Sequence, residues 1–137
     1  MSRDAVLFLC VANSSRSQMA EGLLRVLAPE IPVYSAGSAP AVLNPYAVRA
    51  MEEAGIDIGS HTSKGFDDVP RDHVGTVITL CAEEVCPYFP GDVERLHWPF
   101  EDPAAAMGDD GAILEAFIRV RDQIRVRLMA WLAERSL

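Results

Sequence analysis

A cysteine followed by an arginine is the feature of this sequence with the clearest chemistry. Cys10 ends an apolar run that starts at Ala5, and Arg16 follows a short polar loop and opens a predicted helix. The backbone amides of such a turn and the free N–H groups of a helix N-terminus together form an anion-binding concavity. The Arg16 guanidinium adds two coplanar donors, and the positive field favours the thiolate form of Cys10. The stretch therefore predicts a nucleophilic cysteine below a bound tetrahedral oxyanion, such as phosphate or arsenate.

Cys10 and Arg16 have a second interpretation. Cys10 could be a core cysteine and Arg16 a solvated residue of the first helical turn, with their spacing due to chance. The residues between them favour the functional interpretation, because Asn13, Ser14 and Ser15 are small and polar. Ser15 and Gln18 also match a capping box, in which both side chains bond the free N–H groups of the helix start. We expect this box at the N-terminus of the helix.

Two further cysteines, Cys81 and Cys86, follow a second predicted buried strand. Cys10 and Cys81 each come directly after a central strand, which places them at one edge of a parallel sheet. A structural zinc site would need a second ligand pair, which the sequence lacks. In a helix the Cα atoms of Cys81 and Cys86 would lie roughly 8.6 Å apart, too far for a disulfide without unwinding. Pro87 would ease that unwinding. A thiol relay and two inert buried cysteines both remain open.

Asp102 stands in a proline-bounded loop after the last predicted strand. At the same edge of the sheet, its carboxyl group can act as a general acid toward a leaving oxygen. The alternative is an Asx turn or a helix cap, since Asp-Pro commonly opens turns.

The elements that must position these residues alternate between strand and helix patterns. The predicted strands cover 5–11, 32–35, 75–80 and 93–97, and the predicted helices cover 17–28, 44–54 and 111–134. Such alternation predicts a parallel sheet with right-handed crossovers. With 137 residues, the chain fits one domain, residues 1–137. We therefore expect a three-layer α/β sandwich with a four-stranded parallel sheet flanked by helices on both faces.

Composition narrows the functional class. The net charge of −8 argues against a nucleic-acid binder, and the clustered basic residues of the last helix (Arg119, Arg121, Arg125, Arg127) are expected on a solvated face. No apolar run is long enough to span a membrane, and the first residues lack the apolar segment of a signal peptide. An odd count of three cysteines does not suit a secreted disulfide framework. These features predict a cytoplasmic protein.

Several motifs taken together resemble arsenate reductases of the thioredoxin-linked class, which have the low-molecular-weight protein tyrosine phosphatase fold. The resemblance runs from residue 5 to the last helix and rests on residues 10–22, 34–37, 61–63, 81, 86, 97–98 and 102–103. The phosphate loop alone would indicate only the superfamily. The cysteines at positions 81 and 86 indicate the reductase.

The resemblance implies roles for the residues around Cys10. Cys10 would attack arsenate, Arg16 would hold it, Asp102 would protonate the departing oxygen, and Ser17 would hydrogen-bond the Cys10 sulfur. The residues implied to bind the oxyanion, with phosphate or sulfate as analogues of arsenate, are Val11, Ala12, Asn13, Ser14, Ser15 and Arg16.

The resemblance also implies a relay of disulfides. Cys81 would attack the Cys10–arsenic adduct and release arsenite, and Cys86 would then take over the bond to give Cys81–Cys86 for thioredoxin to reduce. The implied enzyme is a monomer with no cofactor and no metal.

Three departures from the family pattern stand out. The interval between Cys81 and Cys86 is shorter than in well-known members of the family. Ser15 stands where some members carry a further cysteine. Some relatives bind a monovalent cation near the residues that match Asn13, Glu21 and Ser35. Those relatives carry an acidic residue where this chain has Lys64. We expect the Lys64 ammonium group to supply the positive charge of that cation, so potassium should have little effect on activity or thermal stability.

Two alternatives differ in class. A phosphatase acting on phosphotyrosine would usually carry an aromatic residue directly after the Asp-Pro pair, where this chain has Ala104, although residual phosphatase activity fits the shared loop. A thiol-based redox sensor would not need the proton donor Asp102.

Overall fold

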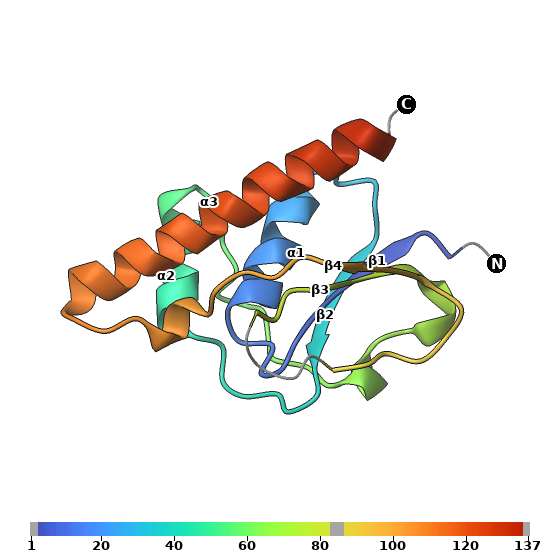
Figure 1. The fold of residues 1–137 in the computed structure, drawn as a ribbon, viewed down its shortest axis with the longest axis horizontal. Coiled ribbons are helices and arrows are strands. Elements are labelled where there is room, and N and C mark those ends of the chain that lie inside the picture. Colours follow the sequence, from blue (N-terminus) through green and yellow to red (C-terminus); the bar gives the residue numbers. More distant parts are fainter. Residues whose placement is uncertain (1–2, 83–86, 136–137) are drawn as a thin grey trace.

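The computed structural model describes residues 3–82 and 87–135. A four-stranded parallel sheet forms the centre, in the order β2-β1-β3-β4 (Figure 1). The strands are β1 (Ala5–Cys10), β2 (Val33–Gly37), β3 (Val74–Thr79) and β4 (Glu94–His97). Every residue of β1 is buried, as its unbroken apolar run predicts.

Three α-helices and three 3₁₀ helices complete the fold. They are α1 (Arg16–Leu27), α2 (Pro45–Glu53) and α3 (Asp110–Arg135), with η1 (Phe66–Asp68), η2 (Arg71–His73) and η3 (Pro103–Ala105). The three α-helices share one apolar cluster with Val6 and Phe8 of β1, and α3 lies across α1 and α2 (Figure 1). The opposite face carries Leu7 and Leu9, which pack with residues of the η1 region and with Phe89.

The expected α/β sandwich with one parallel sheet is confirmed. The helical cover of the two faces is unequal, since the second face is covered by short 3₁₀ turns and extended segments instead of long helices. Its apolar cluster is correspondingly the smaller one. No helix among residues 3–82 and 87–135 is long and apolar enough to cross a membrane.

The start of α2 follows the sequence signal. The Asn44 side chain accepts a hydrogen bond from the Tyr46 N–H at 2.8 Å, and Pro45 occupies the first turn. This is the arrangement that an Asn-Pro pair favours at a helix start.

One prediction for α3 is wrong. Arg119, Arg125 and Arg127 are exposed as expected, but Arg121 is only 6% exposed. Its guanidinium donates to the Ala50 carbonyl at 2.6 Å and to the Glu53 carboxylate at 2.7 Å. The C-terminal end of α2 offers unpaired carbonyl groups there, and a buried guanidinium satisfies them.

Candidate active site

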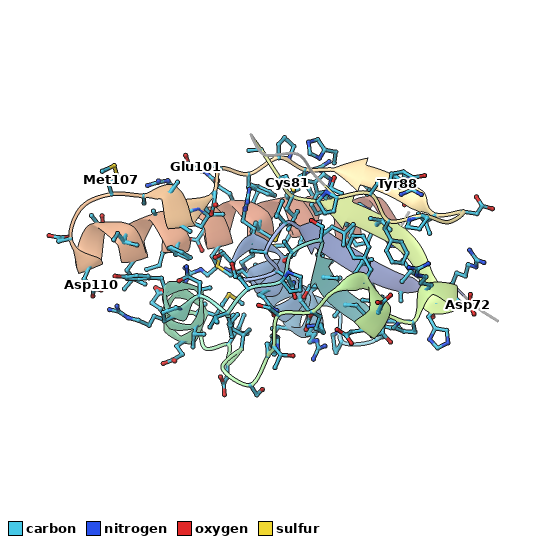
Figure 2. The ribbon with its side chains drawn as sticks, turned by 90° about the horizontal axis from the view of Figure 1, so that it is seen from below. Asp72, Cys81, Tyr88, Glu101, Met107 and Asp110 are labelled. Carbon is cyan, nitrogen blue, oxygen red and sulfur yellow. The ribbon has the colours of Figure 1, made fainter. Side chains whose placement is uncertain are left out.

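The ends of β1 and β3 bring two cysteines to one edge of the sheet. Leu9 is paired with Thr79, and the Leu80 N–H donates to the Leu9 carbonyl at 3.0 Å. Cys10 therefore leaves the sheet beside the segment that carries Cys81. Cys81 is labelled in Figure 2. Both cysteines are nearly covered, at 3% and 1% exposed.

A pocket of about 270 Å³ opens above Cys10. The loop after β1 forms one side, and the loop around Asp102 forms the other. The lining residues are Cys10, Val11, Ala12, Ser14, Ser15, Arg16, Asp102 and Ala104. The structure thus gathers the predicted oxyanion-binding residues around the predicted nucleophile, except for Asn13, which is fully buried behind the loop.

The carbonyl groups of the loop point away from this pocket. Those of Val11, Ala12 and Ser14 accept hydrogen bonds from the N–H groups of residues 39, 41 and 44, at 2.9, 3.0 and 2.9 Å. Because the C=O and N–H of one peptide group point in opposite directions, the N–H of each following residue is turned toward the inside of the loop. This orientation supplies the converging donors that an oxyanion needs.

Gly37, at the end of β2, allows the loop to lie this close to the sheet. A Cβ atom at this position would collide with the Val11 carbonyl oxygen and would stand 2.9 Å from the Asn13 nitrogen. A side chain here would displace the anion-binding backbone.

Asn13 stabilises the conformation of the loop through hydrogen bonds to residues 63 and 64. Its φ of 51° is left-handed, a conformation that Asn tolerates better than most residues. Its side-chain oxygen accepts from the Lys64 N–H at 2.7 Å, and its carbonyl accepts from Ser63 Oγ at 2.8 Å.

Gln18 also serves the loop, so the predicted capping box is wrong. Its amide nitrogen donates to the Asn13 side chain at 3.1 Å and to the Thr62 carbonyl at 2.9 Å. Ser15 is the N-cap residue of α1, but its side chain makes no capping bond. Contacts with the distant 62–64 segment outcompete the local motif.

A chain of hydrogen bonds leads from Asn13 to the nucleophile. Asn13 Nδ2 donates to Ser17 Oγ at 2.9 Å, and Ser17 Oγ lies 2.9 Å from Cys10 Sγ. A Cys10 thiolate could only accept, so the Ser17 hydroxyl would be the donor to that form of the sulfur. A donor held in this way stabilises a thiolate.

Arg16 connects the loop with the two neighbouring segments. The residue is 4% exposed, and its Nη1 donates to the carbonyls of Phe100 at 2.9 Å and Leu80 at 3.4 Å. Its Nη2 stands 3.8 Å from Asp102 Oδ2. The guanidinium is therefore fixed at the pocket wall before any ligand binds.

Asp102 caps a short helix, which is one of the two roles that the sequence left open, while its role as a general acid stays a prediction. Its Oδ1 accepts from the Ala104 N–H at 3.0 Å and caps η3. Its Oδ2 faces Arg16, and the side chain is 43% exposed at the pocket. One oxygen anchors the loop, while the other lies beside Arg16 in a residue that lines the pocket.

A buried carboxylate lies behind the loop. Glu21 accepts from Ser35 Oγ at 2.6 Å and from Arg25 Nη2 at 2.9 Å, while Lys64 Nζ lies 3.8 Å away. Lys64 thus contacts the carboxylate as expected, whereas the small effect of potassium stays a prediction.

His61 belongs to the same cluster. Its Nδ1 lies 3.1 Å from Gln18 Oε1 and 3.6 Å from Glu21 Oε2. Burial lowers the pKa of His61 below its ordinary value, while the Glu21 carboxylate acts in the opposite direction. The signal that could have revealed this cluster is the pair Gln18 and Glu21, two polar residues within a buried stretch of helix.

The two cysteines that the structure describes differ in state. Cys10 is a free thiol, and Cys81 is disulfide-bonded. Cys86 lies outside the described residues, so its role as the resolving thiol stays a prediction.

Comparison with known proteins gives a consistent family relationship. Residues 5–136 match the sequence profile of the low molecular weight phosphotyrosine protein phosphatases. An arsenate reductase of Halalkalibacterium halodurans is 47% identical over 131 residues, which cover 93% of this chain and 94% of the relative.

Comparison with solved structures gives the same relationship. A structure described as an arsenate reductase in the phosphate binding state superimposes with a TM-score of 0.78 at 37% identity, and the match covers 98% of both chains. A thioredoxin-dependent arsenate reductase of Corynebacterium glutamicum gives a TM-score of 0.69 at 30% identity, over 97% of this chain and 64% of that one.

Proposed function

Because this chain belongs to the low molecular weight phosphotyrosine protein phosphatase family, we propose that its pocket reduces arsenate to arsenite through a three-cysteine cascade. The observation that carries the proposal is the position of Cys10. It lines the pocket formed by the loop after β1, hydrogen-bonded to Ser17, with the fixed guanidinium of Arg16 beside it.

The first step is a substitution at arsenic. The Cys10 thiolate forms a sulfur–arsenic bond while one arsenate oxygen departs, and Asp102 donates the proton that lets this oxygen leave as water. The loop amides and Arg16 stabilise the charge on the remaining oxygens. The oxidation state of arsenic does not change here.

The second step carries the electrons. The Cys81 sulfur attacks Cys10 Sγ, a disulfide forms, and the electron pair of the sulfur–arsenic bond leaves with arsenic as arsenite. Cys86 then attacks Cys81, and Cys10 departs as a thiolate. The dithiol of thioredoxin reduces the remaining Cys81–Cys86 bond, so two electrons pass from thioredoxin to arsenic. The common sheet edge of Cys10 and Cys81 supports this order.

Thioredoxin as the reductant is supported by the name of the Corynebacterium glutamicum neighbour. The proposal includes a monomeric, cytoplasmic enzyme without a bound cofactor, since an external dithiol supplies the electrons.

Phosphotyrosine hydrolysis is the second candidate, because the loop chemistry is shared. The described lining of the pocket contains no aromatic side chain, and Ala104 occupies the position next to Pro103. A wall of this kind offers no ring on which an aryl group can stack, which favours a small inorganic oxyanion.

The test is NADPH oxidation in the presence of arsenate, thioredoxin and thioredoxin reductase. We expect sustained consumption that requires arsenate and disappears in Cys10→Ser. Hydrolysis of an aryl phosphate without arsenate-dependent consumption would assign the pocket to a phosphatase. A disulfide that forms under peroxide while arsenate causes no consumption would assign it to a redox sensor.

A further inference from the structure

The chemistry of the Cys10 thiol does not require an oxyanion as the substrate. Cys10 is a free thiol whose sulfur lies 2.9 Å from Ser17 Oγ. The pocket that it lines has a volume of about 270 Å³, which admits a molecule of two oxygen atoms as well as a tetrahedral anion. A thiolate in an accessible pocket is also the form of cysteine that peroxides oxidise.

Cleavage of a peroxide bond by a thiolate is assisted by a proton for the departing oxygen. The sulfur attacks one oxygen, and the other leaves as hydroxide unless an acid protonates it. Asp102 Oδ2 and Arg16 Nη2 lie 3.8 Å apart, and both residues line the pocket. Because Arg16 is held by the Phe100 carbonyl at 2.9 Å, its positive charge is fixed there. A carboxyl group and a cation thus border the space in which the leaving oxygen would be released.

A second thiol is needed to keep the oxidised cysteine from further damage, since a sulfenic acid that meets no thiol is oxidised irreversibly. Cys81 meets this need. It follows β3 beside the end of β1, where Leu9 is paired with Thr79 and accepts the Leu80 N–H at 3.0 Å. Cys81 is disulfide-bonded in the structure, so its sulfur takes part in disulfide chemistry. A sulfenic acid on Cys10 would therefore have a thiol at the same edge of the sheet.

We propose that the chain also reduces hydrogen peroxide at Cys10, an activity that rests on the thiol relay of the proposed function. The Cys10 thiolate attacks one peroxide oxygen, the O–O bond breaks, and the other oxygen leaves as water with the Asp102 proton. The Cys81 thiol then attacks the Cys10 sulfenic acid, a disulfide forms, and a second water leaves. Two electrons pass from the two thiols to the peroxide, and thioredoxin replaces them as in the arsenate cycle.

Turnover is measured as NADPH oxidation with hydrogen peroxide, thioredoxin and thioredoxin reductase. We expect sustained consumption, which Cys10→Ser reduces to the rate of thioredoxin and its reductase without the protein. Cys81→Ser should also stop turnover, and peptide mass spectrometry should then find the sulfinic acid on Cys10. Sustained turnover by Cys81→Ser would overturn the proposal.

The same preparation is assayed with arsenate in parallel, which separates this activity from the proposed function. Consumption with arsenate but not with peroxide would overturn this inference and leave the proposed function intact. Consumption with peroxide but not with arsenate would support this inference and refute arsenate reduction. Consumption with neither would overturn both, because the shared relay would be absent.

The contribution of the pocket is tested by the rate at which reduced Cys10 reacts after mixing with peroxide. Asp102→Asn should slow this reaction by about 100-fold or more, because the leaving oxygen loses its proton donor. Alkylation of Cys10 by iodoacetamide is the matched control, since iodide leaves without a proton, and its rate should not change. Inorganic phosphate should slow both reactions by occupying the pocket. An equal change of both rates in Asp102→Asn, or peroxide oxidation that saturating phosphate does not slow, would overturn the proposal.

Discussion

In the proposed mechanism, proton transfer to the leaving oxygen depends on the carboxyl group of Asp102. Asp102→Asn keeps an oxygen that can accept the Ala104 N–H, so η3 stays capped, but it removes the acid. We expect kcat for arsenate to fall by about 100-fold or more, with a nearly unchanged melting temperature. Steady-state kinetics and thermal unfolding of the same preparation check both parts. An activity within threefold of wild type would show that another group supplies the proton.

His61 makes folding stability depend on pH. Burial lowers its pKa from the ordinary 6.5, although Glu21 opposes this. Between the lowered pKa and 6.5 the unfolded chain binds more protons than the folded one, so stability is lost as the pH falls through this window. In His61→Gln, which retains a polar group next to Gln18, the melting temperature should fall less steeply between about pH 7 and pH 5. Parallel curves for the two proteins would contradict this assignment.

At the residue scale, the sequence predicted which residues gather around Cys10 better than it predicted the contacts that support the loop. Cys10, Arg16 and Asp102 carry local signals, and the structure places all three around one pocket. Gln18 and His61 depend on each other across 43 positions of the chain. No local pattern encodes such a contact, so the capping box was the natural but wrong expectation.

At the scale of elements, the contact between α2 and α3 depends on Arg121. Arg121→Ala removes the donors to the Ala50 carbonyl and to Glu53 and leaves a buried carbonyl unpaired. We expect the free energy of unfolding to fall by about 2 kcal/mol. Denaturant titration measures it.

The exposed Arg125 on the same helix provides the control, and Arg125→Ala should change the free energy of unfolding by less than about 0.5 kcal/mol. Equal effects of the two substitutions would mean that Arg121 contributes no more than a surface side chain.

The elements themselves were predictable wherever an apolar pattern had clear ends. The buried strand β1 and the Asn44–Pro45 start of α2 are examples. The exposed edge strand β4 gives a weaker signal, because Glu94 and Arg95 interrupt its apolar character. The burial of Arg121 was not predictable from its own helix, since the carbonyls that hold it belong to α2.

At the scale of the whole molecule, the proposed anion site lies within a protein of net charge −8. Attraction must therefore be local, and the structure shows how: outward carbonyls, a helix N-terminus and one fixed guanidinium act over a few ångströms. The parallel sheet brings these groups together because the C-terminal ends of β1 and β3 lie side by side. The alternation of strands and helices predicted that edge, whereas the placement of all three α-helices on one face depended on packing between distant segments.

The central claim is the passage of electrons along three sulfurs, and Cys86→Ser tests it most directly. The variant is fully reduced, freed of reductant and mixed with excess arsenate, and both the arsenite released per chain and the disulfide are determined, the latter by peptide mass spectrometry. The account predicts about one arsenite per chain and a trapped bond between Cys10 and Cys81. No arsenite, a different disulfide, or many arsenite equivalents per chain in a parallel sample with thioredoxin added would contradict it.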